Sequence, residues 1–369
     1  MSLTLNTTYR PWRWVGAPAP GGLVLPAAHP SASTLYAPRG VLIQEDLLVA
    51  VDSGNHRVLI WHGLPEEDHA AAQVVLGQPD FESEGPAKGG PERGLRLPTG
   101  VGVFEGRLYV ADAWHHRVLW WNDIPQENRP PDGVIGQADF SSVEVNRGDR
   151  VGPSTLYWPY AIAYSHGRFS IADTGNRRVL IWNGLPEHEQ PPDQVLGQDD
   201  FETNLENRGA EPCGKSFRWP HGITQVGSRY LVADAGNHRV LGWEDELDRH
   251  KDADLVLGQA DLTSNGEWPY GPQGGHRFRF PYAIESWGET LAVSDTANNR
   301  VLVWEDFSLQ PSCAPAVQVL GQRNLEANGE NRWDCVQHDS LCWPYGLDLH
   351  ENLLAIADSG NNRVMLWKR

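Results

Sequence analysis

One unit recurs six times along this chain of 369 residues, from near residue 36 to the last residue. Each copy holds an apolar run that ends in Asp, an Arg five residues further on, and a second apolar run that ends in Trp. The copies are LLVAVDSGNHRVLIW (47–61), LYVADAWHHRVLWW (108–121), FSIADTGNRRVLIW (169–182), YLVADAGNHRVLGW (230–243), LAVSDTANNRVLVW (291–304) and LAIADSGNNRVMLW (354–367). Their aspartates recur at intervals of 60, 61, 61, 61 and 63 residues. This period indicates one array of like units instead of the several domains that length alone suggests.

Four short strands fit within each unit. The first follows the Pro of an aromatic-Pro-x-Gly/Ala motif such as WPYA, the second ends at the Asp, the third is the RVLIW run, and the fourth is VLGQ. Alternating apolar residues, with Gly, Pro and Asn at the breaks, favour strands over helices. The pattern predicts an all-β, six-bladed β-propeller of four-stranded blades. We expect a single domain over 1–369, with blade units that begin near residues 36, 97, 158, 219, 280 and 343.

The sixth unit stops after its third strand and carries no VLGQ run. Residues 12–18, WRWVGAP, resemble VLGQP in spacing and apolarity. We predict that this N-terminal segment supplies the outer strand of the last blade. Such a strand closes the ring and covers two sheet edges that would otherwise be unpaired.

The turn between the second and third strands carries a family resemblance. The motif D-x-G-N-H-R-V, at 52–58 and 234–240, resembles the NHL repeat, and related motifs occur in the other units. The resemblance implies a six-bladed propeller, but such proteins include protein-interaction scaffolds, RNA-binding modules, a zinc-dependent lyase and lactonase-like relatives. Bacterial NHL-like propellers also accompany metalloenzyme assembly, hydrogenase systems included. The resemblance therefore indicates a fold and leaves the function open.

Charge and composition exclude several classes of partner. The chain has 30 Lys and Arg against 48 Asp and Glu, a formal charge of -18, and such a surface repels nucleic acid and anionic lipid. No apolar run is long enough to cross a membrane, and the N-terminus lacks the basic start and apolar core of a secretion signal. Four Cys do not make a disulfide scaffold in a chain of this length. We expect a cytoplasmic protein with reduced thiols that binds neither nucleic acid nor membrane.

Six internal copies separate residues that serve the blade from residues that are free to serve a site. The repeated Asp and Arg, such as Asp52 and Arg57, occur in every unit, so we interpret them as an architectural ion pair and not as a catalytic dyad. The residue before that Arg is His in three units, as His56, His116 and His238. Three His could hold a metal, but these lie on turns separated by the width of the ring. We expect them to form local hydrogen bonds or to face solvent.

The residue after each Pro varies between units and is therefore more informative. The first strand of a propeller blade lies innermost, so these residues should ring the upper mouth of the central channel, where the long inter-blade loops emerge. They are Arg39, Thr99, Tyr160, His221, Tyr282 and Tyr345. Such a ring suits a planar, anionic or carbonyl-bearing ligand or a peptide tail; alternatively, the side chains plug the channel. In the second unit Trp114 and His115 break the usual turn pattern, and we expect them at a contact site.

Two carboxylates follow on the same strands, at Glu285 and Asp348 of the fifth and sixth units. If both point inward, they could hold a divalent cation or act as acid and base. Alternatively, each could pair with an Arg of the next blade. A zinc-type ring of three channel histidines is absent, because His221 is the only His in its column.

These features favour a protein-interaction scaffold or accessory propeller that binds a protein or peptide partner through its upper mouth and carries no catalytic site. Long variable loops and the aromatic ring support this interpretation. The resemblance adds metalloenzyme assembly, of the hydrogenase type, as a role. The alternative is a metal-dependent lactonase or lyase-like enzyme in the channel mouth, with its metal held by Glu285 and Asp348 and with help from His221 or a Tyr. We expect no cofactor other than a divalent cation.

Overall fold

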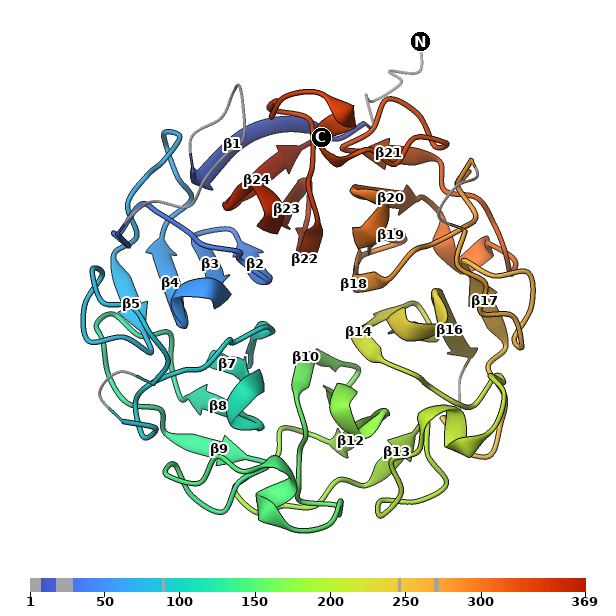
Figure 1. Ribbon diagram of the computed structural model, residues 1–369, viewed down its shortest axis with the longest axis horizontal. Coiled ribbons are helices and arrows are strands. Elements are labelled where there is room, and N and C mark those ends of the chain that lie inside the picture. The colour runs from blue at the N-terminus through green and yellow to red at the C-terminus, as the bar shows by residue number, and fades with distance from the viewer. Residues whose placement is uncertain (1–7, 18–28, 88–89, 245–246, 269–271) are drawn as a thin grey trace.

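The protein is a ring of six four-stranded antiparallel sheets around a central axis (Figure 1). The computed structural model describes residues 8–17, 29–87, 90–244, 247–268 and 272–369. The chain passes once round the ring, so that successive units of the sequence form neighbouring blades. The predicted all-β, six-bladed architecture is confirmed.

In each of the first five blades, the strands follow one another from the axis to the rim in chain order. Blade one holds β2 (Gly40–Gln44), β3 (Leu47–Asp52), β4 (Arg57–His62) and β5 (Val74–Leu76). Blade two holds β6 (Val101–Phe104), β7 (Arg107–Asp112), β8 (Arg117–Trp121) and β9 (Gly133–Ile135). Blade three holds β10 (Pro159–Ser165), β11 (Arg168–Asp173), β12 (Arg178–Asn183) and β13 (Gln194–Leu196). Blade four holds β14 (Pro220–Val226), β15 (Arg229–Asp234), β16 (Arg239–Glu244) and β17 (Leu255–Leu257). Blade five holds β18 (Pro281–Trp287), β19 (Thr290–Asp295), β20 (Arg300–Trp304) and β21 (Gln318–Leu320).

The sixth blade is completed by the N-terminal strand. From the axis to the rim it holds β22 (Pro344–His350), β23 (Leu353–Asp358), β24 (Arg363–Lys368) and β1 (Arg10–Gly16). Strand β1 pairs antiparallel with β24, and Val15 is fully buried in a core shared by blades one and six. The predicted closure is confirmed. The strand begins two residues before the predicted segment 12–18, of which Pro18 lies outside the described residues.

A short 3-10 turn links the second and third strands of every blade. The residue that follows the turn is left-handed in all six blades, with φ between 53° and 57°. Asn and His take this conformation more readily than most residues. The position is occupied by His in three blades, by Asn in two and by Arg in one. The turns are η1 (Ser53–Asn55), η2 (Ala113–His115), η4 (Thr174–Asn176), η6 (Ala235–Asn237), η7 (Thr296–Asn298) and η10 (Ser359–Asn361).

The repeated Asp and Arg hold this turn in place. In blade one, Arg57 Nε donates to Asp52 Oδ2 at 2.7 Å, and the Tyr36 backbone N–H donates to Asp52 Oδ1 at 2.6 Å. Both charged side chains are fully buried. The same ion pair spans 2.7–3.1 Å in all six blades. The pair is therefore part of the blade architecture. Loss of either partner would leave the other charge buried and unpaired.

A second contact joins one blade to the next, and we call it the latch. In a latch, the left-handed residue after the 3-10 turn accepts a hydrogen bond from a backbone N–H at the start of the following blade. The donor and acceptor residues of the five latches are Leu97 and His56 (3.0 Å), Trp158 and His116 (3.1 Å), Phe280 and His238 (3.2 Å), Trp343 and Asn299 (2.9 Å), and Ala37 and Asn362 (2.9 Å). Blade three has Arg177 at this position, and there the Trp219 N–H donates to Asp234 instead, at 3.2 Å. The three histidines thus serve separate blade junctions and do not meet at a metal site.

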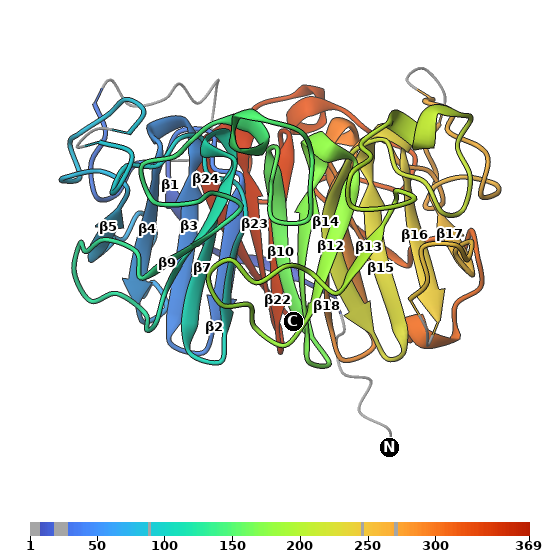
Figure 2. The same cartoon turned by 90° about the horizontal axis from the view of Figure 1, so that it is seen from below.

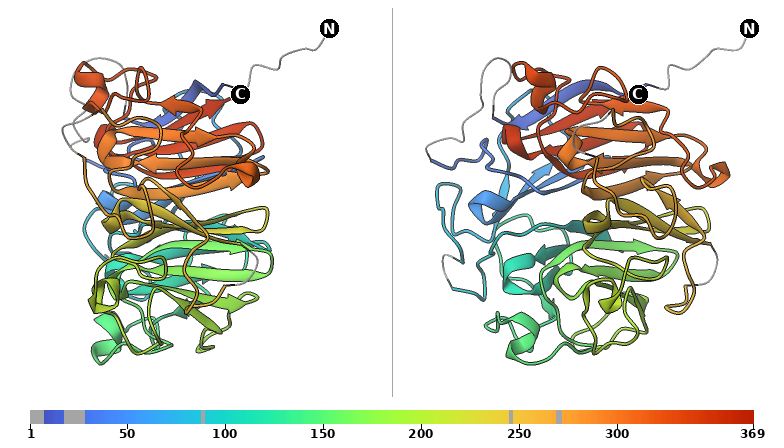
Figure 3. Two further views of the ribbon diagram at one scale, coloured as in Figure 1. Left: turned by 90° about the vertical axis from the view of Figure 1, so that its right-hand side faces the viewer. Right: turned by 45° about the vertical axis from the view of Figure 1, so that its right-hand side comes forward.

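The two faces of the ring differ in what covers them. The 3-10 turns between second and third strands and the long inter-blade loops gather on the upper face, whereas the hairpins between first and second strands lie on the lower face (Figure 2, Figure 3). The remaining 3-10 turns are η3 (Val145–Gly148), η5 (Glu206–Gly209), η8 (Phe307–Leu309) and η9 (Glu330–Trp333). Among the described residues, no helix has the length and apolarity to span a membrane. All four cysteines are free.

Candidate functional site

The innermost strands of the six blades enclose a central channel with a cavity of about 350 Å³. Residues from β2, β6, β10, β14, β18 and β22 line it. Each of these strands begins at the upper face and ends at the lower face, so equivalent positions form levels along the channel. Two levels hold the channel residues predicted from the sequence: the upper mouth and the middle.

Five of the six residues predicted at the upper mouth pack against one another, and we call these five the plug: Arg39, Tyr160, His221, Tyr282 and Tyr345. Ring centroids lie 4.3 Å apart for Tyr160 and His221 and for His221 and Tyr282, and 4.8 Å apart for Tyr282 and Tyr345. The Arg39 guanidinium lies 4.9 Å from the Tyr345 ring centroid. The sixth residue, Thr99, is buried beside them and donates to the Tyr160 carbonyl oxygen at 2.9 Å.

Burial favours the neutral forms of three plug residues. Tyr160 is 4% exposed and His221 is 1% exposed. Burial lowers the pKa of His221 to about 3, raises the pKa of Tyr282 to about 12, and raises the pKa of Tyr160 well above its ordinary value. His221 Nδ1 donates to the Trp219 carbonyl oxygen at 2.9 Å. The predicted residues share the upper mouth, but their side chains fill it by packing together instead of leaving an open ring.

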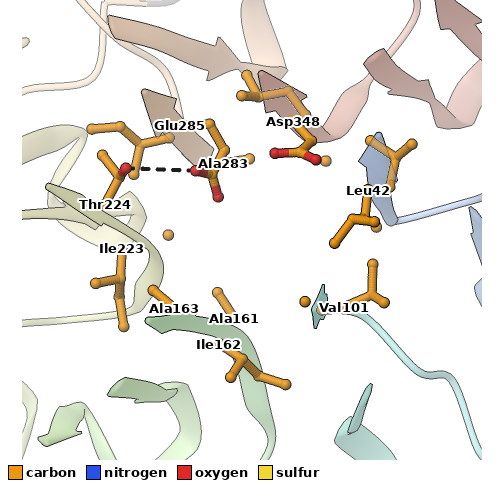
Figure 4. A pocket seen from close by; sticks show the side chains of 18 of the residues that line it. Leu42, Val101, Ala161, Ile162, Ala163, Ile223, Thr224, Ala283, Glu285 and Asp348 are labelled. Carbon is orange, nitrogen blue, oxygen red and sulfur yellow. Dashed lines mark hydrogen bonds between the residues drawn. The ribbon is translucent and has the colours of Figure 1, made fainter. Parts of the chain in front are cut away.

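Two carboxylates face the middle of the channel (Figure 4). Glu285 lies on β18 and Asp348 on β22, in neighbouring blades. Asp348 Oδ2 accepts a hydrogen bond from the Ile43 backbone N–H at 2.7 Å, and Thr224 Oγ1 donates to Glu285 Oε2 at 3.5 Å. Burial raises the pKa of Asp348 to about 7. Burial, with the Asp348 charge added to it, raises the pKa of Glu285 well above its ordinary value.

This carboxylate pair has no cationic partner among the described residues. No Arg, Lys or His contributes to the pKa of either group, so the alternative of an ion pair with the next blade is not found there. The facing wall is apolar and includes Val101, Ala161 and Ala163 (Figure 4). An uncompensated pair of carboxylates in a cavity can hold a cation or share a proton near neutral pH.

In the turn of blade two, the side chain of Trp114 is exposed, whereas that of His115 is buried. Trp114 is 43% exposed. His115 is buried, with its Nδ1 2.8 Å from Asp112 Oδ2. There it replaces the Asn that binds the same Asp in the other blades, as Asn55 binds Asp52 at 2.9 Å. His115 therefore serves the turn, and its side chain is not available at the surface.

A set of aromatic side chains surrounds the plug on the upper face, and we call it the collar: Tyr36, Trp114, Tyr157, Trp158, Trp219, Phe280 and Trp343. Tyr36, Trp114, Tyr157 and Trp343 are between 37% and 45% exposed. Trp219 and Phe280 stack at 6.4 Å, and Trp114 meets Trp158 at 6.5 Å. The sequence pattern led us to interpret the aromatic-Pro motif as a feature of the repeat, and we predicted no binding role for its aromatic residue. A comparison of the residues two before each Pro could have revealed Tyr36 and Tyr157, because other blades have Arg or Cys there.

Three members of the collar are held by the latches described above. Trp158, Phe280 and Trp343 have positive φ, from 49° to 53°, which is unusual for bulky residues. Each donates its backbone N–H to the latch acceptor of the preceding blade. The blade junctions thus fix the backbone from which these aromatic rings project.

A family model described as NHL repeat matches residues 95–121, which include β6, β7 and β8. The chain is a six-bladed β-propeller with an NHL repeat in its second blade. Among solved structures, this propeller is similar to a structural genomics protein of unknown function from Bacteroides thetaiotaomicron VPI-5482. That likeness has a TM-score of 0.54 at 12% identity, and it covers 94% of this chain and 75% of that chain. It shows the fold alone. No curated protein matches the chain in sequence.

Proposed function

We propose that this NHL propeller is a non-catalytic binding protein that docks a protein or peptide partner on its upper face. The observation that carries this proposal is the collar, a group of exposed aromatic side chains on one face. Large exposed apolar patches mark interaction sites, and Trp, Tyr and Arg supply much of the binding energy at protein interfaces. A protein-binding or accessory role fits the NHL propeller fold.

Two arginines lie against aromatic rings of the collar and add guanidinium groups to this face. The Arg96 guanidinium lies 5.9 Å from the Trp114 ring centroid, and that of Arg218 lies 4.9 Å from the Trp219 ring centroid. Stacked in this way, an Arg and an aromatic ring lose little side-chain entropy when a partner arrives. Arg39 and Tyr345 of the plug are half-buried at the centre of the same face. The filled mouth favours a broad contact across the face over a ligand inserted deep into the channel.

The resemblance to bacterial NHL-like propellers suggests one class of partner. Accessory proteins of metalloenzyme assembly, including hydrogenase systems, belong to that group. We extend the proposal to this class, in which the propeller would hold an assembly component on its upper face.

Replacement of Trp114 by Ala is expected to weaken partner binding by about 2 kcal/mol or more, since a central Trp is a typical hot spot. The wild-type propeller, purified by affinity from its native host, should carry a defined partner at near-equal stoichiometry. Mass spectrometry identifies that partner, and calorimetry compares its affinity for the variants.

Trp287→Ala is the matched control, because Trp287 is 44% exposed and ends β18 at the lower face. This variant should bind as the wild type does. A partner held equally by both variants, or the absence of any stoichiometric partner, would contradict docking on the collar.

The carboxylate pair of the channel favours a second candidate function. Glu285 and Asp348 could hold a divalent cation for a lactonase or lyase-like reaction, with His221 and the tyrosines of the plug above them. Hard cations such as Ca²⁺ prefer oxygen ligands of this kind. The uncompensated charge of the pair is the observation behind this candidate.

Glu285→Gln should make the metal-free protein more stable than the wild type at pH 8. Raised pKa values mean that the folded state binds protons more tightly than the unfolded state, so the pair costs stability as pH rises through about 7, the pKa of Asp348. Added Ca²⁺ should raise the melting temperature of the wild type and leave that of the variant unchanged. Glu127→Gln, an exposed carboxyl on an outer loop, is the control. Equal melting temperatures with and without Ca²⁺ for all three proteins would rule out this site.

A further inference from the structure

A cluster of metal-ligand side chains lies at the lower mouth of the channel, below the carboxylate pair and on the opposite face from the collar. A ring nitrogen of His350 and one carboxylate oxygen from each of Glu45 and Glu351 lie within 4.8 Å of one another. Glu45 directly follows β2, His350 ends β22, and Glu351 begins the turn after it. The cluster therefore joins the innermost hairpins of blades one and six.

A hydrogen bond in the channel wall sets the geometry of this cluster. The Ile43 backbone N–H donates to Asp348 Oδ2 at 2.7 Å, which connects β2 to β22. Ile43 lies two residues before Glu45, and Asp348 lies two residues before His350. Two residues span only about 7 Å of strand, so the bond fixes the two hairpin tips close to the point where the ligands meet.

The imidazole of His350 is oriented by packing against an aromatic ring. The Trp287 ring lies against it, with centroids 4.5 Å apart. His350 Nε2 is shielded from solvent and makes no hydrogen bond to any described residue. A shielded nitrogen without a partner costs free energy. The ring nitrogen that lies near the two carboxylates can bind a metal ion without first breaking a hydrogen bond to a described residue. Both carboxylates beside the ring are exposed, whereas the ring is half-buried.

We propose that Glu45, His350 and Glu351 bind a zinc-type transition-metal dication at the lower mouth. The donor set of one imidazole nitrogen and two carboxylate oxygens suits Zn²⁺ and its neighbours, whereas Ca²⁺ and Mg²⁺ prefer oxygen ligands alone. Three protein ligands leave one position of a tetrahedral site for water or for a ligand that enters the channel. The ion would also bridge blades one and six, which share the core that β1 completes.

Zinc titration of tag-free, chelator-treated protein tests the site by calorimetry. We expect one Zn²⁺ per chain, and we expect His350→Ala to weaken its binding about tenfold or more because the site loses its only nitrogen ligand. Glu45→Gln and Glu351→Gln should weaken it as well. Because the ion joins two blades, Zn²⁺ should raise the melting temperature of the wild type and not that of His350→Ala.

His166→Ala is the matched control, since His166 is an exposed histidine on the β10–β11 hairpin of the same face. It should bind Zn²⁺ as the wild type does, and excess Ca²⁺ should not displace the zinc. Equal zinc affinity in the wild type and in His350→Ala would overturn the proposal, as would a lack of stoichiometric binding at micromolar zinc. Circular dichroism of each variant establishes that the fold is intact. The site does not depend on the collar, so this result and the partner experiment succeed or fail separately.

Discussion

Removal of residues 1–17 is expected to lower the melting temperature by about 10 °C or more, or to leave the protein insoluble. The deletion takes away β1, which pairs with β24 from Arg10 opposite Lys368 to Gly16 opposite Arg363. It strips the buried side chains of Trp14 and Val15 from the core, at a cost of about 1 to 5 kcal/mol for each such residue. It also exposes the edge of β24, and an unpaired apolar edge promotes aggregation.

Two point variants separate loss of this strand from loss of the residues that precede it. Val15→Asp places a charge at a fully buried position and should reproduce most of the deletion's effect. Arg10→Asp changes an exposed residue at the start of the same strand and should melt within a few degrees of the wild type. Scanning calorimetry and size-exclusion chromatography measure both. A deletion variant that melts with the wild type would show that the ring does not need β1.

The triple variant His56→Asn, His116→Asn and His238→Asn is expected to resist acid better than the wild type. In these latches the imidazole accepts a hydrogen bond from a backbone N–H, so it must be unprotonated. Burial lowers the pKa of all three, to about 4 for His116 and His238. A folded pKa below the unfolded value of about 6.5 means that the latch is fully stabilising above that pH. This stability is lost progressively as pH falls toward 4.

Asn is the appropriate replacement because the protein already uses it. Asn299 and Asn362 accept the same backbone bond at 2.9 Å and do not titrate. Melting temperatures of wild type and triple variant should agree within a few degrees at pH 7 and separate by about 5 °C or more near pH 4.5. Other titrating groups, such as Asp112, are present in both proteins and cancel in the comparison. His116→Ala, which lacks an acceptor, should be destabilised at every pH. Parallel curves for wild type and triple variant would contradict a role for the latches in acid sensitivity.

The fold was predictable because the same strand pattern recurs six times in the sequence. Asp, Arg and Pro recur at fixed offsets, and a missing fourth strand in the last unit pointed to the N-terminus. The strand itself was placed two residues late, since Arg10 and Pro11 carry no apolar pattern that would mark its start. The structural role of the Asp–Arg pairs followed from the same comparison between units.

The candidate sites were predictable only in part. Strand order places Tyr160, His221 and Tyr282 at one level, but whether they leave a gap or fill it depends on the radius of the ring, which no local pattern encodes. His115 was misjudged although the units align it with the Asn of the other turns. The cluster of Glu45 and His350 joins hairpins some 300 residues apart in the sequence, and only the closed ring brings them together.

The pairing of β1 with β24 also has a consequence for how the protein is made. Strand β1 leaves the ribosome before the other strands of all six blades, and its neighbour β24 is complete only after residues 363–368 have been synthesised. Five blades can therefore form before β1 is paired. Contacts so distant in sequence form slowly, and an apolar strand such as Trp12 to Val15 is exposed to wrong partners meanwhile. A chaperone that shields the nascent β1 strand should therefore raise the yield of closed rings.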